Sequence, residues 1–133
     1  MSLGSTYAED LSLDACYGSG KASGWPGTVY VRLYVGNPTA GGSELTNAGG
    51  YAAIAVTNNS TNWPNASGGA KINGVTFTFP TSTAAWSGNP TYFWLTDSTP
   101  NLLDGGPLTG PIIVPSSGYV VSFAGGAIAI TAT

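Results

Sequence analysis

The sequence predicts a mainly β fold: an antiparallel β-sandwich or jelly-roll-like barrel of seven to eight strands, preceded by one short N-terminal helix. Short runs of residues alternate between apolar and polar side chains, which is the period of a strand with one buried face. The chain has 20 Gly and 9 Pro among 133 residues, and these cluster with Asn and Ser between the runs. Only one segment has a helical pattern, so the crossover helices that a parallel sheet requires are missing.

The helical pattern lies in residues 1–20. Thr6 and Glu9 have the spacing of a capping box, in which a hydroxyl and a carboxylate satisfy the first N–H groups of a helix. The helix is expected to run to about Tyr17 and to stop at residues 18–20, Gly-Ser-Gly. The acidic side chains of Asp10 and Asp14 fall toward the opposite side from the predicted apolar stripe, which consists of Tyr7, Leu11, Leu13, Ala15, Cys16 and Tyr17.

The clearest strand pattern follows Pro26. Alternate residues point to one face at Val29, Val31, Leu33 and Val35, and to the other face at Tyr30, Arg32 and Tyr34. Later runs of the same kind predict strands at residues 51–57, 75–79, 92–97, 112–114, 119–124 and 127–131. Gly125-Gly126 predicts a tight hairpin turn between the last two strands.

The length fits one compact domain. We therefore expect a single β domain over residues 1–133, with a helical segment at 1–20 and the β-sandwich at 28–133. Two connections are unusually long. Residues 36–50 are a candidate contact arm, and residues 58–69 contain Trp63, which either fills the core or faces a partner.

Composition excludes several classes of function. The absence of His removes the usual proton shuttle at neutral pH and the commonest nitrogen ligand of zinc. Three basic residues and a net charge of −3 argue against nucleic acid as a partner. The longest apolar runs are too short to span a membrane. The N-terminus lacks the basic start and apolar run of a secretory signal, which predicts synthesis in a cytoplasm.

The residues that could support catalysis or metal binding are few. Asp97 and Asp104 could form a glycosidase pair, and together with Asn101 they could hold calcium, but both carboxylates have the surroundings of turn formers and the spacing matches no EF-hand. Serine has no evident base, since Lys21 and Lys71 are most simply solvated charges. The sequence therefore predicts no enzyme, no metal site and no cofactor.

The stronger signal is for binding a partner. Tyr30, Arg32 and Tyr34 share a strand face, and aromatic and Arg side chains are enriched at protein interfaces. With Trp63 they are the predicted partner-binding residues; the alternative is an ordinary strand surface and a core Trp. Tyr92 and Trp94 share one face of another strand, and Phe93 and Leu95 share its other face. We expect one of these two sets to be exposed or covered by another chain. Aromatic rings of this kind could also form a stacking platform for sugars.

Several motifs resemble a known family. They are Gly49-Gly50-Tyr51-Ala52, Val56-Thr57-Asn58-Asn59-Ser60-Thr61-Asn62-Trp63-Pro64, Gly68-Gly69-Ala70-Lys71, Phe79-Pro80-Thr81 and Val121-Ser122-Phe123-Ala124-Gly125-Gly126-Ala127-Ile128. Together they resemble small virion proteins of tailed bacteriophages, commonly labelled tail-fibre proteins. The segments 3–17 and 28–34 resemble the same family. The resemblance implies a non-enzymatic structural component of a virion, made in the cytoplasm of a bacterial host.

Two functions fit this resemblance. The first is a capsid decoration (cement) protein that forms a homo-oligomer and stabilises the head shell, with phage structural proteins, above all the major capsid protein, as partners. The second is a tail-fibre module that binds host-surface carbohydrate. The sequence favours decoration, because it has no coiled-coil heptads or fibrous repeats for a shaft, and its low charge suits burial between proteins.

Overall fold

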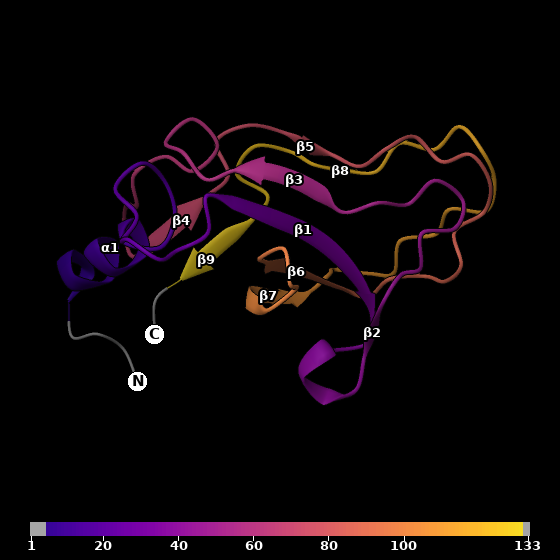
Figure 1. The fold of residues 1–133 in the computed structure, drawn as a ribbon, viewed down its shortest axis with the longest axis horizontal. Coiled ribbons are helices and arrows are strands. Elements are labelled where there is room, and N and C mark those ends of the chain that lie inside the picture. Colours follow the sequence, from indigo (N-terminus) through magenta and orange to yellow (C-terminus); the bar gives the residue numbers. More distant parts are fainter. Residues whose placement is uncertain (1–4, 132–133) are drawn as a thin grey trace. The chain divides into compact units, whose positions relative to one another are not determined.

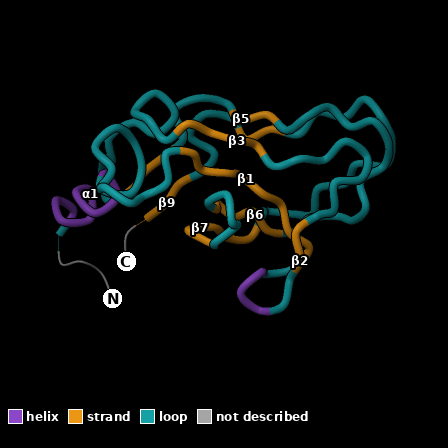
Figure 2. Tube along the Cα trace, viewed as in Figure 1, coloured by secondary structure: helices purple, strands orange, loops and turns teal. Residues whose placement is uncertain are grey.

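The computed structural model describes residues 5–131 (Figure 1). Within this range the elements are α1 Thr6–Asp14, β1 Thr28–Val35, a 3-10 helix Pro38–Ala40, β2 Ser43–Glu44, β3 Ile54–Thr57, β4 Ala70–Ile72, β5 Phe77–Thr78, β6 Tyr92–Thr96, β7 Leu102–Pro107, β8 Ser122–Phe123 and β9 Ala129–Thr131. The predicted fold class is confirmed: the protein is mainly β, with antiparallel sheets and one short α-helix, although the sheets do not close into a barrel. Long loops join the short strands (Figure 2).

The chain forms two compact units. Unit 1 contains the residues up to Thr28, Val56–Phe77 and the residues from Phe123 on, whereas unit 2 contains Val29–Ala55 and Thr78–Ser122. Each unit is therefore built from segments that are distant in the sequence. The expected single β domain over residues 1–133 stays a prediction.

The N-cap of helix α1 lies one residue before the predicted cap, and the helix ends three residues before the predicted end. Its N-cap is Ser5, whose hydroxyl accepts a hydrogen bond from the Ala8 N–H at 3.2 Å, so Thr6 is the first helical residue and not the cap. The helix ends at Asp14, before the expected end near Tyr17. The chain continues in a tighter turn, in which the Cys16 N–H donates to the Leu13 carbonyl at 3.1 Å.

The predicted apolar stripe is confirmed for Leu13 and Tyr17, which are buried, but it is wrong for two residues of α1. Tyr7 and Leu11 are 73% and 54% exposed. The helix docks instead through its acidic side, because Asp10 accepts from the Gly69 N–H at 2.8 Å and Asp14 lies 2.6 Å from the Lys71 ammonium group. Polar contacts thus position this helix, with Leu13 as its buried apolar residue.

Unit 1 has an aromatic core beside the two-stranded sheet of β4 and β9. The Trp63 ring lies 5.3 Å from the Tyr17 ring and 5.5 Å from the Phe77 ring, measured between centroids, and is completely buried. Asn58, which is also buried, accepts from the Gly18 N–H and donates to two carbonyl groups, those of Cys16 and Pro26. The polar side chain of Asn58 in this Asn-rich loop therefore has a structural role.

The five-stranded sheet has the order β2-β1-β6-β7, and β3 also pairs with β1. The β1 prediction is confirmed on its apolar side, where Val29, Val31 and Leu33 are completely buried, as is Leu95 of β6. Val35, at the end of β1, is instead 45% exposed. The candidate contact arm at residues 36–50 is tied to this sheet, because β2 pairs with the end of β1.

Strand β7 is absent from the sequence prediction, which treats Asp104 and the following two glycines as a turn. In the structure Leu95 pairs with Asp104 and Trp94 with Gly105. A Cβ atom at Gly105 would overlap the Trp94 indole and the Phe93 carbonyl. Gly105 therefore lets the Trp94 ring lie close to the backbone of β7. In the sequence, a glycine with this role looks the same as a glycine that forms a turn.

The C-terminal hairpin prediction is also wrong. A turn does form at Gly125-Gly126, where the Ala127 N–H donates to the Ala124 carbonyl at 2.9 Å. The strands on either side do not pair with each other, because β8 pairs with β5 and β9 pairs with β4. Residues 112–114 form a loop and not the predicted strand.

Candidate partner-binding face

The outer side of the five-stranded sheet carries aromatic side chains. In the pairing of β1 with β6, Tyr30 lies opposite Thr96, Arg32 opposite Trp94, and Tyr34 opposite Tyr92. Directly opposed residues in an antiparallel pair point to the same side of the sheet. These six residues therefore share one side, which we call the aromatic face, while the other side of β1 belongs to the core.

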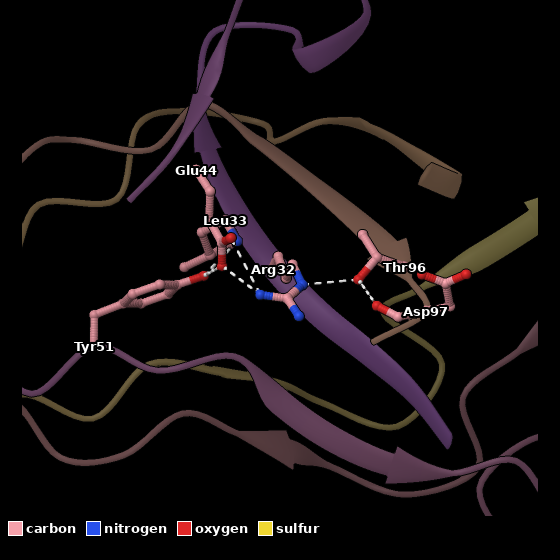
Figure 3. A network of polar contacts seen from close by, with 6 residues as sticks. All are labelled: Arg32, Leu33, Glu44, Tyr51, Thr96 and Asp97. Carbon is pink, nitrogen blue, oxygen red and sulfur yellow. Dashed lines mark hydrogen bonds and ion pairs between the residues drawn. The ribbon is translucent and has the colours of Figure 1, made fainter. Parts of the chain in front are cut away.

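Arg32 is the centre of a polar network on this face (Figure 3). Its Nη1 lies 3.1 Å from both carboxylate oxygens of Glu44, and its Nε donates to the Thr96 hydroxyl at 2.8 Å. The guanidinium carbon also lies 5.2 Å from the centroid of the Tyr30 ring, within range of a cation–π contact. The arginine is thus held in one orientation and its charge is balanced by Glu44.

Tyr51 fixes the other end of this network. Its hydroxyl donates to Glu44 at 2.9 Å and accepts from the Leu33 N–H at 3.0 Å. Burial raises the pKa of Tyr51; the Leu33 hydrogen bond opposes this, and the Glu44 carboxylate adds to it. The phenol therefore stays protonated at neutral pH and remains a donor to Glu44.

The four predicted partner-binding residues do not lie together. Tyr30 and Arg32 are partly exposed on the aromatic face, whereas Tyr34 on the same face is only 5% exposed. Burial raises the pKa of Tyr34, and the Glu44 carboxylate adds to this effect. Trp63 is a core residue of unit 1, so of its two predicted positions, in the core or facing a partner, it has the first. That these residues bind a partner stays a prediction.

Sequence reasoning missed the residues that organise the face. Glu44 lies in a loop by sequence, and only its position in β2, opposite Tyr34, brings it to Arg32. Thr96 reaches Arg32 from a strand more than sixty residues away along the chain. A lone Glu in a Gly-rich segment gave no local signal of this pairing.

The residues considered for catalysis have structural positions. Asp97 is a turn former as predicted, since its carboxylate accepts from the Thr99 and Asn101 N–H groups, and hydrogen bonds led by the Asn101 side chain lower its pKa. Asp104 is part of β7, so the turn prediction for it is wrong. Lys71 is also not a solvated charge: its side chain is 1% exposed and paired with Asp14. No group of three potential metal-binding His, Cys, Asp or Glu residues occurs within residues 5–131.

Comparison with known proteins identifies the family. The sequence model of the family described as "Podophage GP4 fiber I protein gp80" matches residues 4–131, and the chain belongs to this family. It is therefore a structural virion protein of a bacteriophage, which confirms the family resemblance seen in the motifs. No curated protein matches the chain significantly. In the described part of the chain, no helix has the length and apolar character needed to cross a membrane.

Proposed function

We propose that this protein is a non-enzymatic component of the phage tail fibre that binds host-surface carbohydrate through its aromatic face. Membership of a podophage fibre family over residues 4–131 is the observation that carries the proposal. The fibre is the part of a virion that meets the host surface. A small β module with one partly exposed aromatic sheet face suits that task better than the formation of an extended shaft.

The chemistry of the face favours a neutral ligand that is rich in hydroxyl groups. Tyr30, Tyr92 and Trp94 are partly exposed rings that offer flat apolar surface with little loss of side-chain entropy. The Arg32–Glu44 pair supplies oriented donors and acceptors beside them without a net charge. Sugars combine apolar ring faces with hydroxyl edges, so they match this combination of groups.

Capsid decoration is the second candidate. It is supported by the compactness of the two units, by the low overall charge and by the lack of fibrous repeats that a shaft would need. In that role the aromatic face would contact phage structural proteins, with the major capsid protein as the first partner to test, and the protein would act as a homo-oligomer.

A double variant, Tyr30→Ala with Tyr92→Ala, tests the proposal. Tyr34 is left intact because its ring is buried, and truncating it would leave a cavity. Loss of two stacking rings should weaken glycan binding by about tenfold or more, which corresponds to roughly 1.4 kcal/mol. Phage that carry the variant should adsorb poorly to host cells while their heads remain intact.

Tyr7→Ala is the matched control, because Tyr7 is 73% exposed on α1, in the other unit. It removes the same ring but should leave adsorption unchanged. Heads that shed the protein or burst more easily, together with normal adsorption, would favour capsid decoration and reject the carbohydrate proposal. Electron microscopy of particles with labelled protein gives the location independently.

A further inference from the structure

Trp94 lies on the aromatic face with Arg32 on one side of it and Gly105 on the other. It pairs with Arg32 of β1 and with Gly105 of β7, and directly opposed residues point to the same side of a sheet. Gly105 has no side chain, and a Cβ atom there would overlap Cγ and Cδ2 of the Trp94 indole. The indole therefore covers Gly105, and its partly exposed ring forms a platform beside Arg32.

This platform offers a ligand carbon surface but no hydrogen-bond donor. The indole Nε1 of Trp94 is buried and has no hydrogen-bond partner within residues 5–131. A ligand on the exposed part of the ring therefore meets apolar atoms, which suit the C–H face of a sugar ring. The donor that recognises the hydroxyl groups of such a ligand has to come from a neighbouring residue.

Arg32 has one nitrogen left for this purpose. Its Nε is bonded to Thr96 and its Nη1 to Glu44 (Figure 3), whereas Nη2 has no hydrogen-bond partner in the described part of the chain. The buried side-chain nitrogen and oxygen atoms that lack a partner there are all indole nitrogens, so Nη2 is accessible to solvent. Because the guanidinium is already fixed by its neighbours, it loses little conformational entropy when Nη2 donates to a hydroxyl group.

Glu44 determines the charge beside this donor. Both of its carboxylate oxygens accept from Arg32 Nη1, and the buried Tyr51 hydroxyl donates to one of them at 2.9 Å. Arg32 is the only Lys or Arg of unit 2, against the three carboxylates of Glu44, Asp97 and Asp104. An acidic sugar would find this cation already paired and would be repelled by the carboxylate fixed next to it, whereas a neutral sugar would not.

We infer that Trp94 and Arg32 together form one sugar-binding position and that Glu44 restricts it to uncharged sugars. The sugar ring stacks on Trp94, one of its hydroxyl groups accepts from Arg32 Nη2, and the Glu44 carboxylate excludes uronic and other acidic sugars. Gly105 and Tyr51 are positioning residues, because they act through Trp94 and Glu44. This inference rests on the proposed carbohydrate-binding function and adds to it the residues that select among sugars.

Titration calorimetry with paired oligosaccharides tests the selection. One member of each pair ends in glucose or galactose, and the other ends in glucuronic or galacturonic acid, so only a carboxylate replaces a hydroxymethyl group. The wild-type protein should bind the neutral member about tenfold more tightly or better. Glu44→Gln keeps the size of the side chain but frees the charge of Arg32, so it should raise the affinity for the acidic member about tenfold, and NaCl should weaken this new binding. Glu9→Gln is the matched control, because it removes the same charge from α1, in the other unit, and should leave the preference unchanged.

A second pair of variants tests the platform. Gly105→Ala forces the Trp94 indole to move and should weaken the binding of the neutral sugar about tenfold. Gly106→Ala is its control, because a Cβ atom there meets nothing within 4 Å, and it should bind like the wild type. Near-UV circular dichroism should show that each variant is folded.

Three results would overturn the inference while leaving the carbohydrate proposal in place. They are equal binding of both members of a pair by the wild type, an unchanged preference for neutral sugars in Glu44→Gln, and unchanged binding by Gly105→Ala. A wild-type protein that binds neither member of any pair overturns the inference as well. The carbohydrate proposal is then decided separately, by the adsorption of phage that carry the double tyrosine variant.

Discussion

Breaking the ion pair between Asp14 and Lys71 should destabilise the protein much more when Asp14 is replaced than when Lys71 is replaced. The Lys71 side chain is 1% exposed, whereas the Asp14 side chain is 32% exposed. Asp14→Ala leaves a buried ammonium group without its counter-ion. Lys71→Met removes the buried charge, keeps most of the side-chain volume, and leaves Asp14 with both water and the Ala66 N–H, which donates to it at 2.8 Å.

The loss of unfolding free energy expected for each variant follows from these environments. Removing one partner of a buried ion pair costs about 3 to 5 kcal/mol, and the partial exposure of Asp14 places Asp14→Ala near the lower limit, at about 3 kcal/mol. This corresponds to a fall in Tm of about 10 °C for a chain of this size. Lys71→Met should cost about 1 kcal/mol or less, because no charge is left buried. The double variant should therefore recover roughly 2 kcal/mol relative to Asp14→Ala.

Urea denaturation followed by tryptophan fluorescence measures these differences, since Trp63 lies in the core of the same unit. Asp10→Ala is the matched control: it also removes an acceptor of a backbone N–H, from Gly69, but Asp10 takes part in neither of the ion pairs found within residues 5–131. It should cost about 1 kcal/mol. If Lys71→Met destabilises the protein as much as Asp14→Ala, the buried charge is not the cause and the reasoning is refuted.

Two further predictions concern acid pH and strand β7. Burial alone would raise the pKa of Asp14, but the Ala66 N–H and Lys71 lower it below the ordinary value of 3.8. The unfolded state therefore binds more protons at acid pH than the folded state does. As a result, the free energy of unfolding should fall as pH drops below about 4. Urea titrations at a series of pH values should show this decline, and it should be shallower in Asp14→Ala. Gly105→Ala should destabilise the protein by about 1 to 3 kcal/mol through overlap with the Trp94 indole, whereas Gly106→Ala, where a Cβ atom meets nothing within 4 Å, should have little effect on Tm.

The sequence was informative wherever structure follows from local periodicity. The alternation after Pro26 predicts β1 and its buried side, because a strand with one face in the core needs that pattern whatever it pairs with. The same alternation does not say which strand is the neighbour. The last two strands therefore look like a hairpin across Gly125-Gly126, while their actual partners, β5 and β4, precede them by about fifty residues.

Local patterns also failed where a polar contact replaced an apolar one. The helical wheel of α1 places Tyr7 and Leu11 inward on the usual assumption that apolar side chains face the core. The structure reverses this, because Asp10 and Asp14 satisfy backbone and ammonium donors of unit 1. The sequence predicts a solvated charge at Lys71 for a related reason: its partner is 57 residues away, and no short window of sequence contains both.

The arrangement of charge limits what the protein can recognise. The three Lys and Arg side chains are each engaged within their own unit: Lys21 donates to the Asn58 carbonyl at 2.9 Å, Arg32 pairs with Glu44, and Lys71 pairs with Asp14. An anionic ligand would have to displace one of these partners, which leaves neutral surfaces as the easier places to bind. The aromatic face of unit 2 is such a surface, because its partly exposed aromatic residues lie beside the Arg32–Glu44 pair, which carries no net charge. Contacts of this kind are individually modest, so a virion that presents several copies of the aromatic face at once would bind a repetitive host surface by avidity, where a single copy would not be retained.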